Sequence, residues 1–156
     1  MRKCSILLFL LSFKLMTFGQ DDMKTGVIYG DNHAYSLTAP SGWVLDNKSG
    51  VNQGLFAVFY RQGESWKNAQ TVMYTNTASL GDKAHNTLEQ LIKYDLDNFK
   101  RQYSDIQIIN SKDIVIKDNV VATVKYLSGK SYGNYEALAY INAGKTGVMI
   151  IMSSRN

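Results

Sequence analysis

The sequence predicts an α+β domain that consists of a mainly antiparallel sheet and one long amphipathic helix. In the first half, runs rich in aromatic and β-branched residues alternate with turn residues, which is typical of strands. Near the middle, apolar residues recur every three or four positions, which is the period of an α-helix. In the second half, apolar runs are joined by connections too short to hold a crossover helix, so neighbouring strands must run antiparallel.

Five strands are expected before the helix, at residues 27–29, 34–38, 43–45, 55–60 and 71–75. The first two flank a turn from Gly30 to Asn32, whose residues tolerate the left-handed backbone of a hairpin. Pro40, the only proline, cannot donate a ladder hydrogen bond and therefore separates the second strand from the third.

The helix is predicted to run from about Thr87 to Tyr103. Its apolar residues fall on one stripe: Leu88, Leu91, Ile92, Leu96, Phe99 and Tyr103. Thr87 followed three residues later by Gln90 is a capping-box pattern, in which each side chain satisfies a free backbone amide at the helix start. The apolar stripe must be buried, and the adjacent strands are the available partner.

The second half is predicted to be a β-meander. Its strands are expected at residues 106–111, 114–116, 120–127, 135–142 and 147–153. The turns between them are short and contain glycine, asparagine or aspartate, as antiparallel hairpins require. A single domain with a mainly antiparallel sheet follows.

Residues 1–19 are predicted to be a secretory signal peptide. Arg2 and Lys3 precede an apolar run from Ile6 to Phe13, and small or polar residues follow near Gly19. The run is interrupted at Lys14 and is too short to span a membrane. We expect cleavage after Gly19 or after Gln20, and a domain over residues 20–156 that is exported to the periplasm or the extracellular space.

Removing the leader changes the composition of the chain. The whole sequence has 17 Lys and Arg against 13 Asp and Glu; three basic residues lie in the leader, so 14 remain against 13, a formal charge of +1. Without a basic surplus, nucleic acid is an unsuitable partner. The only cysteine, Cys4, is also in the leader, ahead of the apolar run and not behind it as in a lipoprotein signal. The exported domain therefore has no disulfide, thiolate metal site or cysteine nucleophile.

The order of elements, together with two segments, carries a family resemblance. The segment from Tyr35 to Trp43 reads as a strand followed by Pro-Ser-Gly-Trp, and the segment from Leu55 to Tyr60 is the next long apolar run. Over residues 34–153 the chain resembles the PsbP-like and DcrB-like exported domains. The resemblance implies an α/β/α sandwich around an antiparallel sheet and an accessory or binding role without catalysis.

The chain departs from that family at its C-terminal end, because it stops after a strand where such domains have a further helix. Either the sequence is a shortened form of a longer protein, or one face of the sheet is more open. In the second case one of two alternating sets on the last strands lacks a cover: Leu138, Tyr140, Met149 and Ile151, or Ala139, Ile141, Val148 and Ile150. A large exposed apolar patch commonly marks an interface. An uncovered set would therefore predict self-association or capture of an apolar ligand.

Catalytic patterns are incomplete. Gly63 and Ser65 match the first half of a nucleophile elbow, but Lys67 stands where the second glycine belongs. A hydrolase would need Ser65 to meet His33 or His85, the only two histidines. Asp22, Asp31 and His33 are too few and irregularly spaced for a metal site, and Asp21 with Asp22 is interpreted as a polar terminus. We therefore predict no catalytic residue, no metal and no cofactor.

The predicted binding residues lie in the loop between the fourth and fifth strands. Trp66 lies in a polar loop with Arg61, Glu64 and Lys67, a combination suited to recognising a partner. The alternative is that Trp66 anchors the loop to the sheet edge. Most other aromatic residues lie in expected strands, where they fill the core.

Three functions are compatible with these observations. The first is an exported, non-enzymatic accessory or binding domain whose partner is an extracytoplasmic protein or an envelope component. The second is a small extracytoplasmic hydrolase that uses Ser65 or a histidine. The third is a structural or self-associating envelope protein that acts through an open sheet face.

Overall fold

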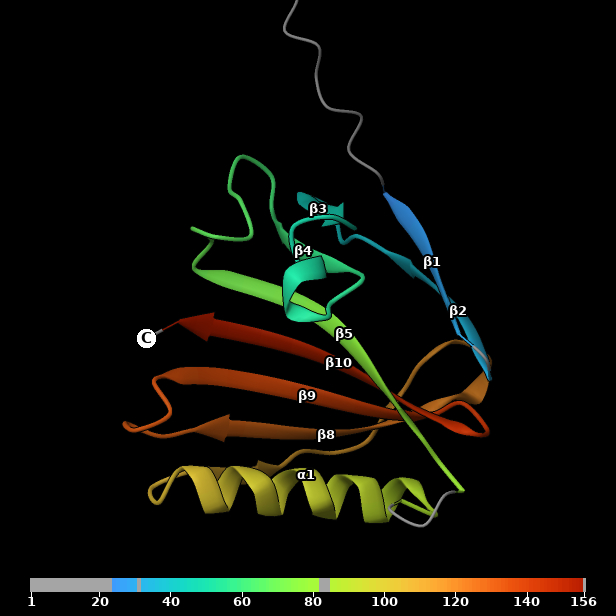
Figure 1. The fold of residues 1–156 in the computed structure, drawn as a ribbon, viewed down its shortest axis with the longest axis vertical. Helices are drawn as coiled ribbons and strands as arrows, with labels where there is room; N and C mark the ends of the chain where they lie inside the picture. The colour runs from blue at the N-terminus through green and yellow to red at the C-terminus, as the bar shows by residue number, and fades with distance from the viewer. Residues whose placement is uncertain (1–23, 31, 82–84, 156) are drawn as a thin grey trace, which may run out of the picture.

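The computed structural model describes residues 24–30, 32–81 and 85–155 (Figure 1). The predicted signal peptide, Cys4, Asp21, Asp22 and Asp31 lie outside the described residues. No helix in the described part of the chain has the length and apolar character needed to cross a membrane.

Ten strands and one α-helix make up the described fold. Before the helix α1 (Leu88–Gln102) lie β1 (Thr25–Gly30), β2 (His33–Thr38), β3 (Trp43–Asp46), β4 (Val58–Arg61) and β5 (Thr71–Ser79). After it lie β6 (Gln107–Asn110), β7 (Ile114–Val115), β8 (Val121–Ser128), β9 (Asn134–Asn142) and β10 (Thr146–Arg155). The short 3-10 helices are η1 (Val51–Gln53) and η2 (Lys117–Asn119).

The main sheet has the strand order β3-β4-β5-β10-β9-β8-β6, and β7 pairs with β8 (Figure 1). Every pairing is antiparallel, which confirms the predicted α+β class. The predicted meander is present as β6-β8-β9-β10. The last strand, β10, also pairs along its length with β5 and thereby joins the two halves of the chain.

Two strand boundaries differ from the prediction by three or more residues. The fourth strand begins at Val58 and not at Leu55, because η1 and the left-handed Gly54 (φ 76°) precede it. The fifth continues to Ser79 and not only to Thr75, because it pairs with β10 as far as Thr146. The first difference is set by a local turn, and the second by a pairing partner distant in sequence.

The helix prediction is confirmed at both ends. The Thr87 side chain accepts from the backbone N–H of Gln90 at 3.3 Å, so Thr87 is the N-cap. The Gln90 side chain accepts from the backbone N–H of Asn86 at 2.8 Å, one residue before the position that a capping box uses. Tyr103 is the C-cap, and its N–H bonds to Phe99.

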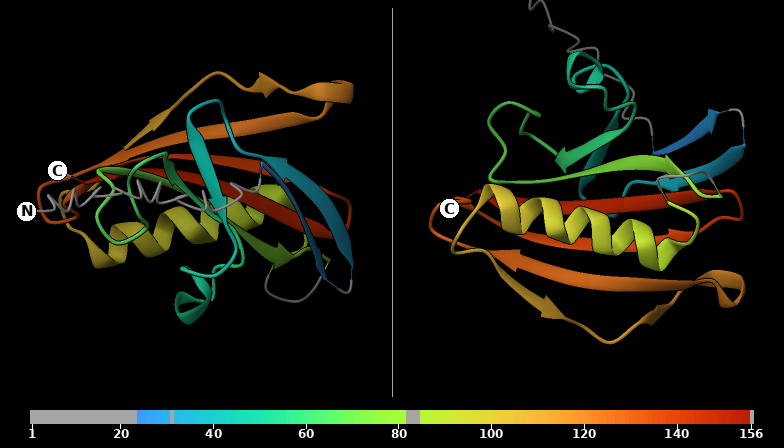
Figure 2. Two further views of the ribbon diagram at one scale, coloured as in Figure 1. Left: turned by 90° about the horizontal axis from the view of Figure 1, so that it is seen from above. Right: turned by 60° about the horizontal axis from the view of Figure 1, so that its bottom comes forward.

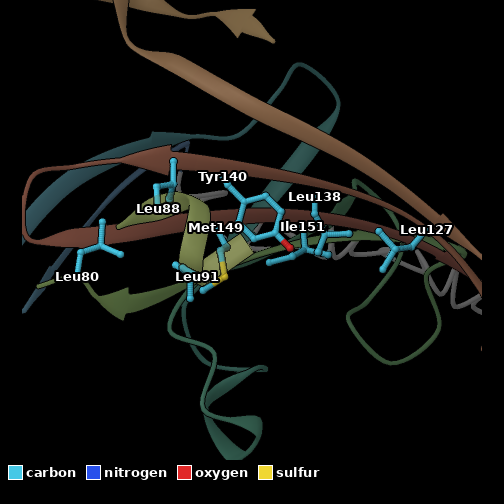
Figure 3. Close-up of a cluster of buried hydrophobic side chains, with 8 residues drawn as sticks. All are labelled: Leu80, Leu88, Leu91, Leu127, Leu138, Tyr140, Met149 and Ile151. Atoms are coloured by element: carbon cyan, nitrogen blue, oxygen red, sulfur yellow. The ribbon is translucent and has the colours of Figure 1, made fainter. Parts of the chain in front are cut away.

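The main hydrophobic core lies between α1 and one face of the sheet (Figure 3). The buried members are Leu80, Leu88, Leu91, Leu127, Leu138, Tyr140, Met149 and Ile151. Gly147 on β10 allows the close approach of the helix, since a Cβ there would lie 2.5 Å from Leu91 Cδ2. The helix thus covers Leu138, Tyr140, Met149 and Ile151, the first of the two sets that the sequence left open.

The β1–β2 hairpin covers part of the opposite face. Its residues Ile28 and Leu37 pack against a second cluster of Leu45, Ala57 and Phe59. The Tyr35 hydroxyl bonds the Thr75 hydroxyl on β5 at 2.9 Å. Of the second predicted set, Val148 is buried, whereas Ala139, Ile141 and Ile150 are only partly buried. Ala122 and Val124 of β8, on the same face, are also buried, and the exposed apolar residues of this face include Met152, Tyr126 and Ile109.

Candidate functional site

A groove of about 380 Å³ runs between α1 and β8. The helix contributes an apolar side and a charged rim, and β8 contributes Thr123 and Lys125. The helical lining residues are Leu88, Glu89, Ile92, Lys93, Leu96, Asp97 and Lys100. Its volume lies within the range of about 300 to 1,000 Å³ that is usual for small-molecule sites.

The groove exists because α1 lies over β9 and β10 and leaves Thr123 and Lys125 of β8 uncovered. Gly147 allows Leu91 to approach β10, and the Tyr140 hydroxyl on β9 donates to Asp95 Oδ2 at 2.7 Å. In the right-hand view of Figure 2, α1 crosses in front of these central strands while β8 passes to one side. Ile92 and Leu96 consequently remain partly exposed, although they belong to the apolar stripe of the helix.

Only some of the charged side chains in the groove form a salt bridge. Lys93 Nζ contacts Asp97 Oδ2 at 2.5 Å, and this hydrogen bond lowers the pKa of Asp97. Lys125 Nζ donates to the neutral Asn110 side chain at 2.8 Å. Among the described residues, neither Lys100 nor Lys125 forms a salt bridge. The groove therefore has an apolar part along the helix and two ammonium groups that can receive an anion.

The buried Tyr140 bonds α1 to the sheet through Asp95, and the partly buried Tyr132 bonds Glu136 on β9. Burial, followed by the hydrogen bond to Asp95, raises the pKa of Tyr140. Burial and the hydrogen bond to Glu136 likewise raise the pKa of Tyr132, and Glu136 is only 7% exposed. Both hydroxyls therefore remain protonated donors at neutral pH, which suits a structural role and not that of a base.

The four residues predicted from the β4–β5 loop are distributed over two faces of the sheet. The Trp66 ring packs edge-on against Tyr74 with centroids 6.1 Å apart, and Tyr74 belongs to the core beneath α1. The Arg61 guanidinium lies 5.6 Å from the ring centroid of Trp43, which packs on the hairpin side. Glu64 and Lys67 are exposed. A partner role for these four residues stays a prediction.

The residues of the hydrolase hypothesis have separate neighbours. The Ser65 hydroxyl donates to Asn68 Oδ1 at 2.7 Å. The ring of His33 lies beside Tyr35, and that of His85 lies against Tyr94 at 4.7 Å. Within the described ranges, no group of three or more His, Cys, Asp or Glu residues could hold a metal ion.

The groove residues Lys100 and Lys125 were not predicted from the sequence. Lys100 lies on the polar side of the helix, which the periodicity assigns to solvent. A weak signal exists in β8, where Thr123 and Lys125 alternate with the buried Ala122 and Val124. The alternation indicates that one side of β8 is more polar, but it does not indicate that this side faces the helix.

Comparison with protein-family models finds no match, and comparison with curated proteins finds none either. Among solved structures, the chain is similar to the solution structure of cyanobacterial PsbP (CyanoP) from Synechocystis sp. PCC 6803. The two share 12% sequence identity with a TM-score of 0.44, over 88% of this chain and 84% of the other. This is a weak resemblance of fold, of the kind that the sequence predicted.

Proposed function

We propose that this chain is an exported, non-enzymatic binding domain and that the groove between α1 and β8 is its ligand site. Export rests on the signal-peptide pattern of residues 1–19. The observation that carries the binding role is the groove itself, where apolar helix residues lie beside two lysines that form no salt bridge within the described residues.

The chemistry of the groove favours an elongated ligand with an apolar body and one anionic group. Leu88, Ile92 and Leu96 follow one another at four-residue spacing and form an apolar strip about 12 Å long. Lys100 lies four residues after Leu96 on the helix, and Lys125 faces the helix from β8. An acyl chain with a terminal carboxylate would place its chain along the strip and its carboxylate between the lysines.

Binding of dodecanoate tests this assignment, with dodecanol as the matched uncharged ligand, measured by isothermal titration calorimetry below the micellar range. We expect the carboxylate to bind roughly tenfold or more tightly than the alcohol, since a charge-assisted hydrogen bond is worth about 1.5–3 kcal/mol. Lys125→Met should remove most of this preference, and Ile92→Ser should weaken both ligands.

Lys145→Met is the matched control, because Lys145 is exposed in the β9–β10 turn and does not line the groove. It should leave both affinities unchanged. Equal affinity for acid and alcohol would refute the role of the lysines. Binding that survives Ile92→Ser unchanged would place the ligand elsewhere.

A further inference from the structure

The sheet face opposite α1 carries one continuous apolar row across seven strands. In register order the row is Leu45, Phe59, Met73, Met152, Ala137, Tyr126 and Ile109. The β1–β2 hairpin covers its first part, where Leu45 and Phe59 are each 4% exposed. At the other end Met152 is 43%, Tyr126 45% and Ile109 59% exposed. The apolar row is thus buried at its Leu45 end and exposed at its Ile109 end.

We call the open half the uncovered face and define it by Ile109, Tyr126, Tyr135, Ala137, Ala139 and Met152. None of these six side chains is charged. The solvated side of an antiparallel sheet is ordinarily polar, whereas strands that are apolar on both sides are ordinarily covered twice. Strands β9 and β10 follow the second pattern, because their other side forms the core under α1.

The uncovered face is as large as the largest apolar patches found on monomers, which are often functional. From their exposed fractions, its four large residues present roughly 500 Å² in all, backbone and hydroxyl groups included, against about 300 to 600 Å² for such patches. A standard interface buries about 800 Å² on each partner, with a polar rim around an apolar centre. The face therefore supplies more than half of such an interface.

We propose that the uncovered face pairs with the same face of a second copy of this chain. An uncharged surface offers no charge complementarity to an acidic or basic partner, and it matches a surface that is equally apolar and uncharged. In a two-fold contact the two copies present the same patch to each other, so this match is met by construction. Sheets pack face to face at about 10 Å, and the low Ala137 and Ala139 leave room for the larger Tyr126 and Met152 of the second copy.

Sedimentation equilibrium of the full chain tests the pairing over roughly a hundredfold range of concentration. We expect a reversible dimer. Ile109→Lys should weaken the association at least about tenfold, because the two-fold axis brings two buried ammonium groups into one interface. Val27→Lys is the matched control, since Val27 is a 64% exposed apolar residue of β1 outside the uncovered face, and it should leave the dimer intact.

A second measurement locates the contact. In a Cys4→Ser background the chain has no cysteine, so Ala137→Cys places the sole thiol on the uncovered face. A short bis-maleimide should then link two copies, and prior Ile109→Lys substitution should abolish the link. A monomer at every concentration, a dimer that Ile109→Lys does not affect, or binding of an apolar dye without dimerisation would each overturn the proposal. None of these readouts depends on a ligand in the groove.

Discussion

At the residue scale, single polar side chains organise the loops. Asp46, at the end of β3, accepts four hydrogen bonds: from the backbone N–H groups of Lys48 (2.7 Å) and Ser49 (2.9 Å), the Ser49 hydroxyl (2.6 Å) and the Tyr60 hydroxyl (2.8 Å). Partial burial raises the pKa of Asp46, but these hydrogen bonds outweigh it and lower the pKa to about 2. The carboxylate thereby fixes the turn that leads to η1.

Asp46→Asn should destabilise the fold at neutral pH. An unfolded Asp has a pKa of about 3.9, so the lowered folded value gives stability that is present above about pH 4 and is lost as the pH falls through about 2. We expect a loss of at most about 1 kcal/mol at pH 7, because the side chain is largely solvated. Urea unfolding of both proteins should show the difference shrinking toward pH 2. Asp113→Asn, at an exposed position, serves as the control.

Trp66→Ala distinguishes the two interpretations of the β4–β5 loop. The Arg155 guanidinium donates to the Lys67 carbonyl at 2.8 Å and to the Trp66 carbonyl at 3.3 Å, and the Trp66 ring packs on Tyr74. We expect Trp66→Ala to lower the free energy of unfolding by about 1 to 2 kcal/mol, while Lys67→Ala changes it by less than about 0.5 kcal/mol. An unchanged free energy of unfolding would instead support the interpretation that the Trp66 side chain binds a partner.

At the scale of elements, the position of α1 on the sheet decides where the groove lies. The helix sequence determines its apolar stripe and its caps, as the Thr87 N-cap confirms. It does not determine which strands the stripe contacts. Gly147 on β10 and the hydrogen bond from Tyr140 to Asp95 place the helix over the central strands, and the polar side of β8 is left open as a consequence.

Gly147→Ala should therefore displace or strain the helix. The added Cβ would lie 2.5 Å from Leu91 Cδ2, and Leu91 is only 4% exposed, so it has little room to move. Overpacking of this kind costs about 1 to 3 kcal/mol, which chemical denaturation can measure. In a double-mutant cycle, the combined Gly147→Ala and Leu91→Ala variant should lose less stability than the sum of the single variants. Additive losses would show that the two residues do not collide.

At the scale of the whole molecule, the sheet is completed by strands that are far apart in sequence. β10 lies between β9, its neighbour along the chain, and β5, which precedes the helix. The two faces are then covered by different means, one by α1 and the other in part by the β1–β2 hairpin. Among the described residues, the groove and the uncovered face are places where this cover is incomplete.

The elements themselves could be predicted from the sequence because their signals are local. Apolar spacing and the Thr87 cap located the helix, and short turns located the hairpins of the second half. The predicted start of the fourth strand at Leu55 was wrong, because the loop before this strand continues past the Gly54 turn. The predicted end of the fifth strand at Thr75 was wrong, because pairing with β10 extends the strand. Lys100 and Lys125 were missed because the groove that both line arises from the placement of the helix.

By itself, the sequence determined the α+β class, the antiparallel second half, the limits of the helix and the two alternating apolar sets of the last strands. These follow from periods of two and 3.6 residues and from turn chemistry, which act over a few residues. The three-dimensional structure was needed to see which set lies under α1, which set the hairpin partly covers, and where a groove remains. Those outcomes depend on the pairing of β10 with β5 and on the close approach of Leu91 to Gly147, contacts between distant segments that no local pattern encodes.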